Sequence, residues 1–175
     1  TRPRRGAAMI EFAVAGAVFL AVHSVPSIAP LRRALLQTLG AGGYLVAYSA
    51  VSLGLLAWLI SAALAAPDIW IWHPPLWGYD AALALASLGT VLVSAGLLRA
   101  NPMSIGFVGA RRFDPARPGL VGVTRHPVLW GFALWAFGHL LANGGLAVVV
   151  LFAALGLFTL GGVVLVDRRH RRLMG

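Results

Sequence analysis

The sequence contains no cysteine and no lysine, and only five of its 175 residues are acidic. The lack of cysteine excludes disulfides, thiolate metal sites, iron–sulfur ligation and cysteine nucleophiles. Histidine, of which the chain has five, is the side chain that remains for metal binding and for proton transfer near neutral pH.

Charge is also missing over long stretches of the chain. Residues 12–31, 34–67, 81–98 and 126–166 contain no Asp, Glu, Lys or Arg. A transmembrane helix needs about 20 mostly apolar residues, so the last stretch is long enough for two, with Asn143-Gly144-Gly145 as the turn. Hydrophobic residues make up 59% of the chain and the mean hydropathy is +0.85, which excludes an ordinary soluble domain.

We therefore predict a single all-α domain over residues 1–175, folded as a polytopic transmembrane bundle of five spans. The spans are expected at residues 10–28, 41–65, 79–98, 128–143 and 146–166. Residues 30–36 are expected to form a short interfacial turn. Residues 100–125 are rich in Gly, Pro and Arg and cannot cross lipid unless protein surrounds them, which predicts a long cytoplasmic loop before the fourth span.

All fourteen basic residues are arginine, and they lie almost entirely between the apolar stretches, although the formal net charge is +9. A nucleic-acid-binding protein would gather its arginines on one solvated face, so we predict no nucleic-acid partner. Arginines between spans favour membrane lipids and an anionic cytoplasmic leaflet as the surroundings. Alternating spans then place the amino terminus outside, a topology with which Arg2, Arg4 and Arg5 disagree.

Three histidines lie within or at the edge of the apolar stretches: His23, His126 and His139. A protonatable side chain at membrane depth is costly, which marks it as a functional site with a partner. His23 precedes Pro26, whose kink could turn the imidazole inward, although a helix-end histidine can also simply cap backbone carbonyls. His139 lies about 18 Å along its helix from Pro127, deep in the bundle.

The segment around His139 also carries small residues at helical spacing. Gly131, Gly138 and Ala142 fall near one face of the predicted helix, and Trp135 is one turn from His139. A stripe of small residues lets another backbone or a flat cofactor come close. Two histidines from facing helices can coordinate haem iron, whereas a zinc site normally needs three or four protein ligands.

Polar residues near the cytoplasmic end of the fourth span form a second group. Pro127 suits the first turn of a helix, which places His126 at its start and Arg125 in the interface. Asn101 opens the Asn-Pro-Met-Ser segment of the long loop, where it either builds a turn or binds a propionate or phosphate. Arg125 and His126 are likewise candidates for binding haem propionates or an anionic headgroup.

Two motifs in these regions resemble the NnrU family of bacterial membrane proteins, to which the zeta-carotene isomerases also belong. They are Ala-Val-His-Ser-Val-Pro-Ser at residues 21–27 and a longer motif that begins with Val-Thr-Arg-His-Pro at residue 123 and ends with His-Leu-Leu-Ala-Asn-Gly at residue 144. Asn101-Pro102-Met103-Ser104 is similar to the loop between them. The resemblance covers residues 9–170.

The resemblance implies a haem b protein of the bacterial inner (cytoplasmic) membrane, with His23 and His139 as the axial iron ligands. It also implies either a role in nitrogen-oxide-linked respiration or redox cis-trans isomerisation, with nitric oxide or an apolar polyene as the small-molecule partner. The isomerases have a cysteine three residues before the second ligand, as an alternative iron ligand. This chain has Ala136 at that position, which argues against isomerisation through a ligand switch.

Two other functions stay open on the sequence. Arg125-His126-Pro127 is also similar to the motif of the membrane methyltransferases that act on isoprenylcysteine or phospholipid and bind S-adenosylmethionine. Their later acidic and tyrosine residues are missing here, because Asp114 and Asp167 are the only acids after residue 80 and no tyrosine follows Tyr79. A non-catalytic haem carrier or assembly factor would use the same two histidine ligands.

Overall fold

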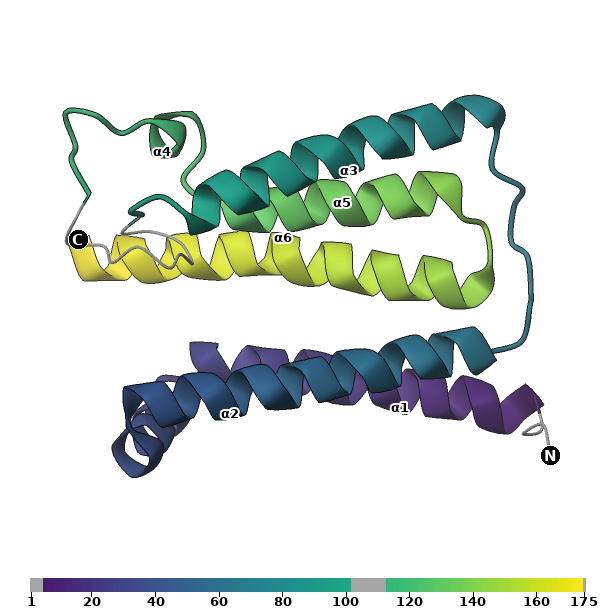
Figure 1. Ribbon diagram of the computed structural model, residues 1–175, viewed down its shortest axis with the longest axis horizontal. Coiled ribbons are helices and arrows are strands. Elements are labelled where there is room, and N and C mark those ends of the chain that lie inside the picture. Colours follow the sequence, from purple (N-terminus) through teal and green to yellow (C-terminus); the bar gives the residue numbers. More distant parts are fainter. Residues whose placement is uncertain (1–4, 102–112, 175) are drawn as a thin grey trace. The chain divides into compact units, whose positions relative to one another are not determined.

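The computed structural model describes residues 5–101 and 113–174, with side chains described as far as residue 168. The helices are α1 (Arg5–Ser24), the 3-10 turn η1 (Val25–Ser27), α2 (Ala29–Ala65), α3 (Leu76–Leu97), α4 (Leu120–Val123), α5 (Pro127–Ala142) and α6 (Leu146–Met174). Figure 1 shows their order along the chain. Four of the helices are long and apolar enough to cross a membrane, and α5 is a shorter apolar helix. The predicted all-α, multi-pass membrane fold is confirmed.

The chain forms two compact units, residues 1–69 and residues 70–175. The first contains α1 and α2, and the second contains α3 to α6. Each unit is described separately below.

In the first unit, α1 and α2 pack through small and aromatic side chains. Ala8, Phe12 and Ala15 lie one turn apart on α1 and are buried, as are Leu59 and Ala62 on α2. This spacing places the three α1 residues on one face of the helix, which is the arrangement that lets two helices bury an apolar stripe against each other.

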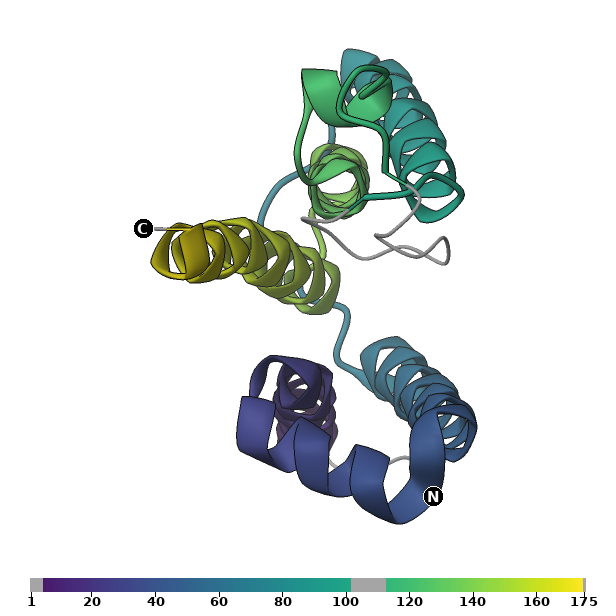
Figure 2. The ribbon, with the colours of Figure 1, turned by 90° about the vertical axis from the view of Figure 1, so that its left-hand side faces the viewer.

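Gly40 divides α2 into two helical segments. Its backbone has φ of 68° and ψ of 171°, a conformation that side chains disfavour and glycine adopts freely. The segment of residues 29–39 runs at a steep angle to the segment that follows (Figure 2). The expected interfacial turn at residues 30–36 is therefore itself helical, and the predicted start of the second span at residue 41 coincides with the break.

In the second unit, α5 packs against both α3 and α6 (Figures 1 and 2). The α3–α5 contact brings two backbones together at Gly89 and Gly131. A Cβ on Gly89 would lie 2.5 Å from the Gly131 carbonyl oxygen, and a Cβ on Gly131 would lie 2.6 Å from the Gly89 carbonyl oxygen. Two helical turns further along α5, a Cβ on Gly138 would lie 2.9 Å from the Ala82 carbonyl oxygen. Side chains would keep the two helices apart, so the glycines set their separation.

These contacts show which of the two predicted partners, another backbone or a flat cofactor, packs against the small-residue stripe. Gly131 and Gly138 face the backbone of α3. A neighbouring helix, not a flat cofactor, therefore occupies this face of α5 at both glycines.

The turn between α5 and α6 lies where the sequence predicted it, because α5 ends at Ala142 and α6 begins at Leu146. The aromatic loop after α2 pairs with this turn. Trp70 forms an antiparallel bridge with Gly145, and the Ile71 amide donates to the Gly144 carbonyl over 2.7 Å. The loop is thereby fixed at one end of the second unit.

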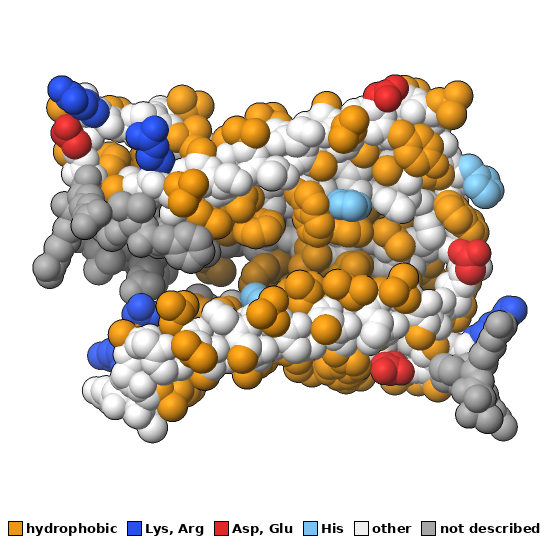
Figure 3. Space-filling view, viewed as in Figure 1, with side chains coloured by type: hydrophobic (Ala, Val, Ile, Leu, Met, Phe, Trp, Pro, Cys, Tyr) orange, Lys and Arg blue, Asp and Glu red, His pale blue; other side chains and the backbone are white. Residues whose placement is uncertain are grey.

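The sides of the helices are apolar and exposed. Leu64 is 83% exposed, Leu83 70% and Leu157 69%. In the second unit, charged side chains gather toward the ends and hydrophobic ones cover the length between them (Figure 3). This distribution suits lipid as the surrounding solvent along the helices and water or headgroups at their ends.

The α3–α5 contact predicts an asymmetry between two glycine-to-alanine substitutions in the second unit. Gly131→Ala should destabilise the protein by about 1–3 kcal/mol, because its methyl group meets the α3 backbone. Gly161→Ala is the matched control, since nothing lies within 4 Å of its Cβ position. SDS titration of the detergent-solubilised protein measures both. Equal midpoints for Gly131→Ala and the parent would contradict the described packing.

Candidate functional site

His23 lies in the last turn of α1, just before the 3-10 turn that contains Pro26. Its Nδ1 lies 2.8 Å from the carbonyl oxygen of Phe19, and its ring stacks on the Phe19 ring at 3.9 Å between centroids. A carbonyl only accepts, so Nδ1 is the protonated nitrogen and donates this bond. In the neutral imidazole, Nε2 then carries the lone pair that can bind a metal.

The side chain of His23 thus does bind a carbonyl of its own helix, as one of the two interpretations predicted, and it uses one nitrogen for that purpose. A hydrogen bond from one ring nitrogen to a carbonyl is common among metal-binding histidines, because it fixes the tautomer and the ring plane.

Two tyrosines of α2 accompany His23. The Tyr48 ring lies 5.9 Å from the His23 ring and 5.8 Å from the Tyr44 ring. The Tyr44 hydroxyl is buried and has no hydrogen-bond partner among the described residues. This polar face of α2 was not among the predicted site residues, although residues 44, 48 and 52 share the spacing of one helical turn.

His139 lies in the last turn of α5, and its ring packs in a cluster with two aromatic side chains. It stacks on Phe152 of α6 at 4.2 Å and 6°, and it meets the edge of Trp135 at 4.7 Å. In the part of the chain that the structure describes, no hydrogen bond reaches either ring nitrogen of His139. The two aromatic neighbours therefore fix the plane of the ring and leave both nitrogens available.

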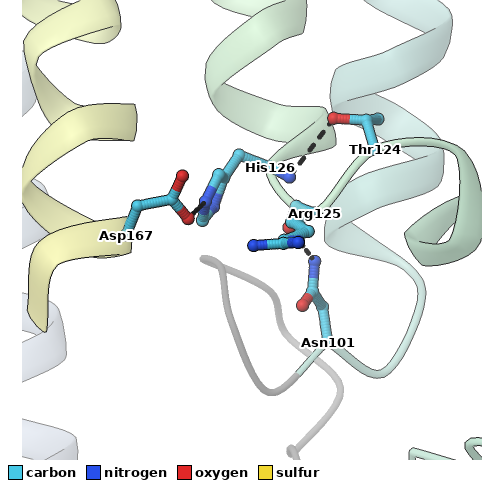
Figure 4. Close-up of polar contacts among 5 residues, drawn as sticks. All are labelled: Asn101, Thr124, Arg125, His126 and Asp167. Atoms are coloured by element: carbon cyan, nitrogen blue, oxygen red, sulfur yellow. Dashed lines mark hydrogen bonds and ion pairs between the residues drawn. The ribbon is translucent and has the colours of Figure 1, made fainter. Parts of the chain in front are cut away.

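His23 belongs to the first unit and His139 to the second, so the two predicted ligands lie in two separate environments. Asn101, Arg125 and His126 all belong to the second unit, and the structure brings them together at the start of α5 (Figure 4).

His126 is the N-cap residue of α5 and is only 3% exposed. Its Nε2 lies 2.8 Å from Oδ1 of Asp167 on α6, and its backbone amide donates weakly to the Thr124 hydroxyl over 3.4 Å. Nδ1 is buried and has no hydrogen-bond partner within the described residues. Asp167, which the sequence analysis did not assign to the site, thus connects the last helix to the start of α5 (Figure 4).

Asn101 is 4% exposed, and its amide donates to the Arg125 carbonyl over 2.9 Å. This bond holds the chain that leads into α5. The Arg125 side chain itself is exposed. Pro102, Met103 and Ser104 lie outside the described residues.

Glu11, near the amino-terminal end of α1, is also paired. Its Oε1 accepts a hydrogen bond from Trp58 Nε1 over 3.3 Å. The bond joins α1 to α2 beside their buried contact, which gives this acid a structural partner within the first unit.

The His126–Asp167 pair predicts that removal of the carboxylate costs stability. Asp167→Ala should lower the free energy of unfolding by about 1–3 kcal/mol, because a buried polar group loses its partner. Arg168→Ala is the control, since Arg168 is the exposed neighbour of Asp167. Thermal unfolding in detergent measures both. The pairing would be refuted by equal midpoints for the two variants.

The geometry of these residues can be compared with known proteins. The family model described as NnrU protein matches residues 11–174, a range that includes His23, His126, His139 and Asp167. No curated protein and no solved structure matches the chain significantly. Because the family model covers nearly the whole sequence, the chain belongs to the NnrU family.

Proposed function

We propose that the chain is an integral membrane haem b protein of the bacterial inner membrane, with His23 and His139 as the axial ligands of the iron. The observation that carries this proposal is the hydrogen bond from His23 Nδ1 to the Phe19 carbonyl. This bond leaves Nε2 available as a ligand nitrogen. His23 lies in an apolar helix, where an imidazole without a partner costs free energy.

The environment of His139 supports the same proposal. Its ring plane is held by Phe152 and Trp135, whereas its nitrogens are left without a protein partner among the described residues. Within the same part of the chain, no group of three or more His, Asp or Glu side chains gathers as a metal site. Two imidazoles suit bis-histidine haem better than zinc.

Haem at this position would supply an iron that binds a small gas or passes single electrons. The residues of the chain would hold its ligands in place, with Phe19 beside one imidazole and Phe152 beside the other. The apolar helices around both would keep water away from the iron, and burial of this kind helps to set a reduction potential.

Of the two roles in the family, we infer that this chain serves nitrogen-oxide-linked respiration rather than isomerisation of an apolar polyene. Ala136 stands where the isomerases have a cysteine. It is 1% exposed, and a Cβ on Gly156 of α6 would lie 3.6 Å from its methyl group. This position supplies no sulfur, so the isomerases' alternative iron ligand has no counterpart here.

The haem proposal predicts a Soret band in the protein purified after haem-replete expression. His23→Ala and His139→Ala should each lose most of the bound haem or change its spin state, because one axial ligand is missing. His73→Ala is the control, since His73 is an exposed loop residue that stacks on Trp70. Visible spectra measure all four proteins. The proposal fails if no Soret band appears, or if both ligand variants keep the parent spectrum.

The choice between the two roles predicts a second pair of results. The ferrous protein should change its visible spectrum on addition of nitric oxide, and it should leave the isomer ratio of added tri-cis-zeta-carotene unchanged in chromatography. Ala136→Cys is the informative variant, because it places a sulfur at the position where the isomerases have a cysteine. Conversion of the carotene by the parent protein would instead assign the isomerase role.

A further inference from the structure

The two long helices of the first unit are joined by a buried contact at one end and by aromatic rings at the other. The buried residues of the two helices, both described over their whole length, are Ala8, Phe12, Ala15, Leu59 and Ala62. His23 lies eight residues beyond Ala15 on α1, which corresponds to a rise of about 12 Å. The imidazole therefore lies beyond the buried contact between α1 and α2.

Within α1, a single residue holds the imidazole. Phe19 accepts the hydrogen bond from His23 Nδ1 at its carbonyl, over 2.8 Å, and its ring stacks on the imidazole at 3.9 Å and 24°. Both contacts come from the preceding turn of the same helix, and α1 ends one residue after His23, at Ser24. The last turn of a helix is the part that most needs partners from outside the helix. Phe19 fixes the imidazole relative to α1, so a further contact has to fix it relative to α2.

Tyr48 supplies that contact. Its ring lies 5.9 Å from the imidazole at an interplanar angle of 59°, within the range of about 4.5–7 Å over which tilted aromatic rings attract each other. Tyr44, one turn earlier on α2, holds the other side of this contact, because its ring stacks with the Tyr48 ring at 5.8 Å and 20°. The rings of Phe19, His23, Tyr48 and Tyr44 thus form a series that joins the two helices.

The second proposed ligand is held by the same arrangement of rings. His139 has Trp135 four residues before it on α5, just as His23 has Phe19 four residues before it on α1. Each imidazole also meets one ring from another helix, which is Phe152 of α6 for His139 and Tyr48 of α2 for His23. Tyr48 therefore corresponds in position to Phe152, whose stacking fixes the plane of its histidine.

We propose that Tyr48 is a positioning residue, which fixes the imidazole plane of His23 for coordination of the haem iron. This inference rests on the proposed function, because His23 is the ligand through which Tyr48 acts. Groups around a ligand histidine orient its ring and thereby tune the metal. The orientation of an axial imidazole about its bond to iron changes the splitting of the iron d orbitals. A ring that is free to rotate therefore alters the ferric EPR spectrum even while it stays bound.

The test is EPR of the ferric full chain in detergent, purified after haem-replete expression. Tyr48→Leu keeps an apolar side chain but removes the flat ring. We expect it to shift the largest g value of the low-spin signal, or to split that signal into two, at unchanged haem content in a pyridine haemochrome assay. Tyr48→Phe keeps the ring and should retain the parent spectrum.

Tyr79→Leu is the matched control, because Tyr79 lies on α3 of the second unit and is 53% exposed. It undergoes the same chemical change and should keep the parent spectrum. An unchanged spectrum in Tyr48→Leu would overturn the proposal. An equal shift in Tyr79→Leu would also overturn it, and so would a shift in Tyr48→Phe as large as that in Tyr48→Leu, because the ring would then not be the group that matters.

A second measurement does not depend on haem. In the full chain expressed without haem and labelled with nitrogen-15 at histidine, NMR of the ring nitrogens reports the tautomer of His23, and His23→Ala identifies its signals. The parent should show the Nδ1-protonated tautomer, whereas Tyr48→Leu should show exchange between both tautomers as the ring leaves the Phe19 carbonyl. An unchanged tautomer would overturn the proposal even if Tyr48→Leu bound no haem. Absence of haem from the parent would instead overturn the proposed function.

Discussion

The second unit depends on the close approach of two backbones. Gly89 and Gly131 let α3 and α5 pack at a distance that any side chain would prevent, and this contact fixes which faces of α5 remain for other purposes. Gly131 and Gly138 face α3, whereas Phe152 of α6 stacks on His139. Association of helices in lipid relies on such packing, because burial of apolar surface brings little gain there. Because α5 is held between α3 and α6, the imidazole ring of His139 lies in a defined plane.

Much of this fold could be predicted from the sequence, because uncharged stretches of about 20 residues have few alternatives to transmembrane helices. The turn at Asn143-Gly144-Gly145 was predicted from its turn-forming residues, and the predicted start of the second span at residue 41 follows the break in α2 at Gly40. The helical character of residues 29–39 was not predicted, since a turn and a short interfacial helix share the same Pro and Arg signals. The sequence also left the partner of the glycine stripe open, and only the packing of α3 identifies it.

The residues of the candidate sites likewise divide into those that the sequence indicates and those that it does not. Isolated histidines in apolar stretches stand out in a sequence because their cost in lipid is large. Their partners do not stand out. The Phe19 carbonyl is backbone, and Phe152 is one apolar residue among many. Asp167 lies 41 residues from His126, a separation at which no local pattern relates two side chains. Asn101 was noticed as a turn or anion-binding residue, and the Arg125 carbonyl to which its amide donates is again backbone, which no side-chain pattern indicates.

The pairing of His126 with Asp167 has a consequence for the order in which the protein assembles. The ribosome adds Asp167 only after α5 and most of α6 have been made. Until then, the imidazole at the entrance of α5 lacks its carboxylate, and the helix end that carries it stays at the wet face of the bilayer, where water can solvate it. Docking of α6 onto the start of α5 therefore follows the synthesis of both helices, and the His126–Asp167 bond then joins them at these ends.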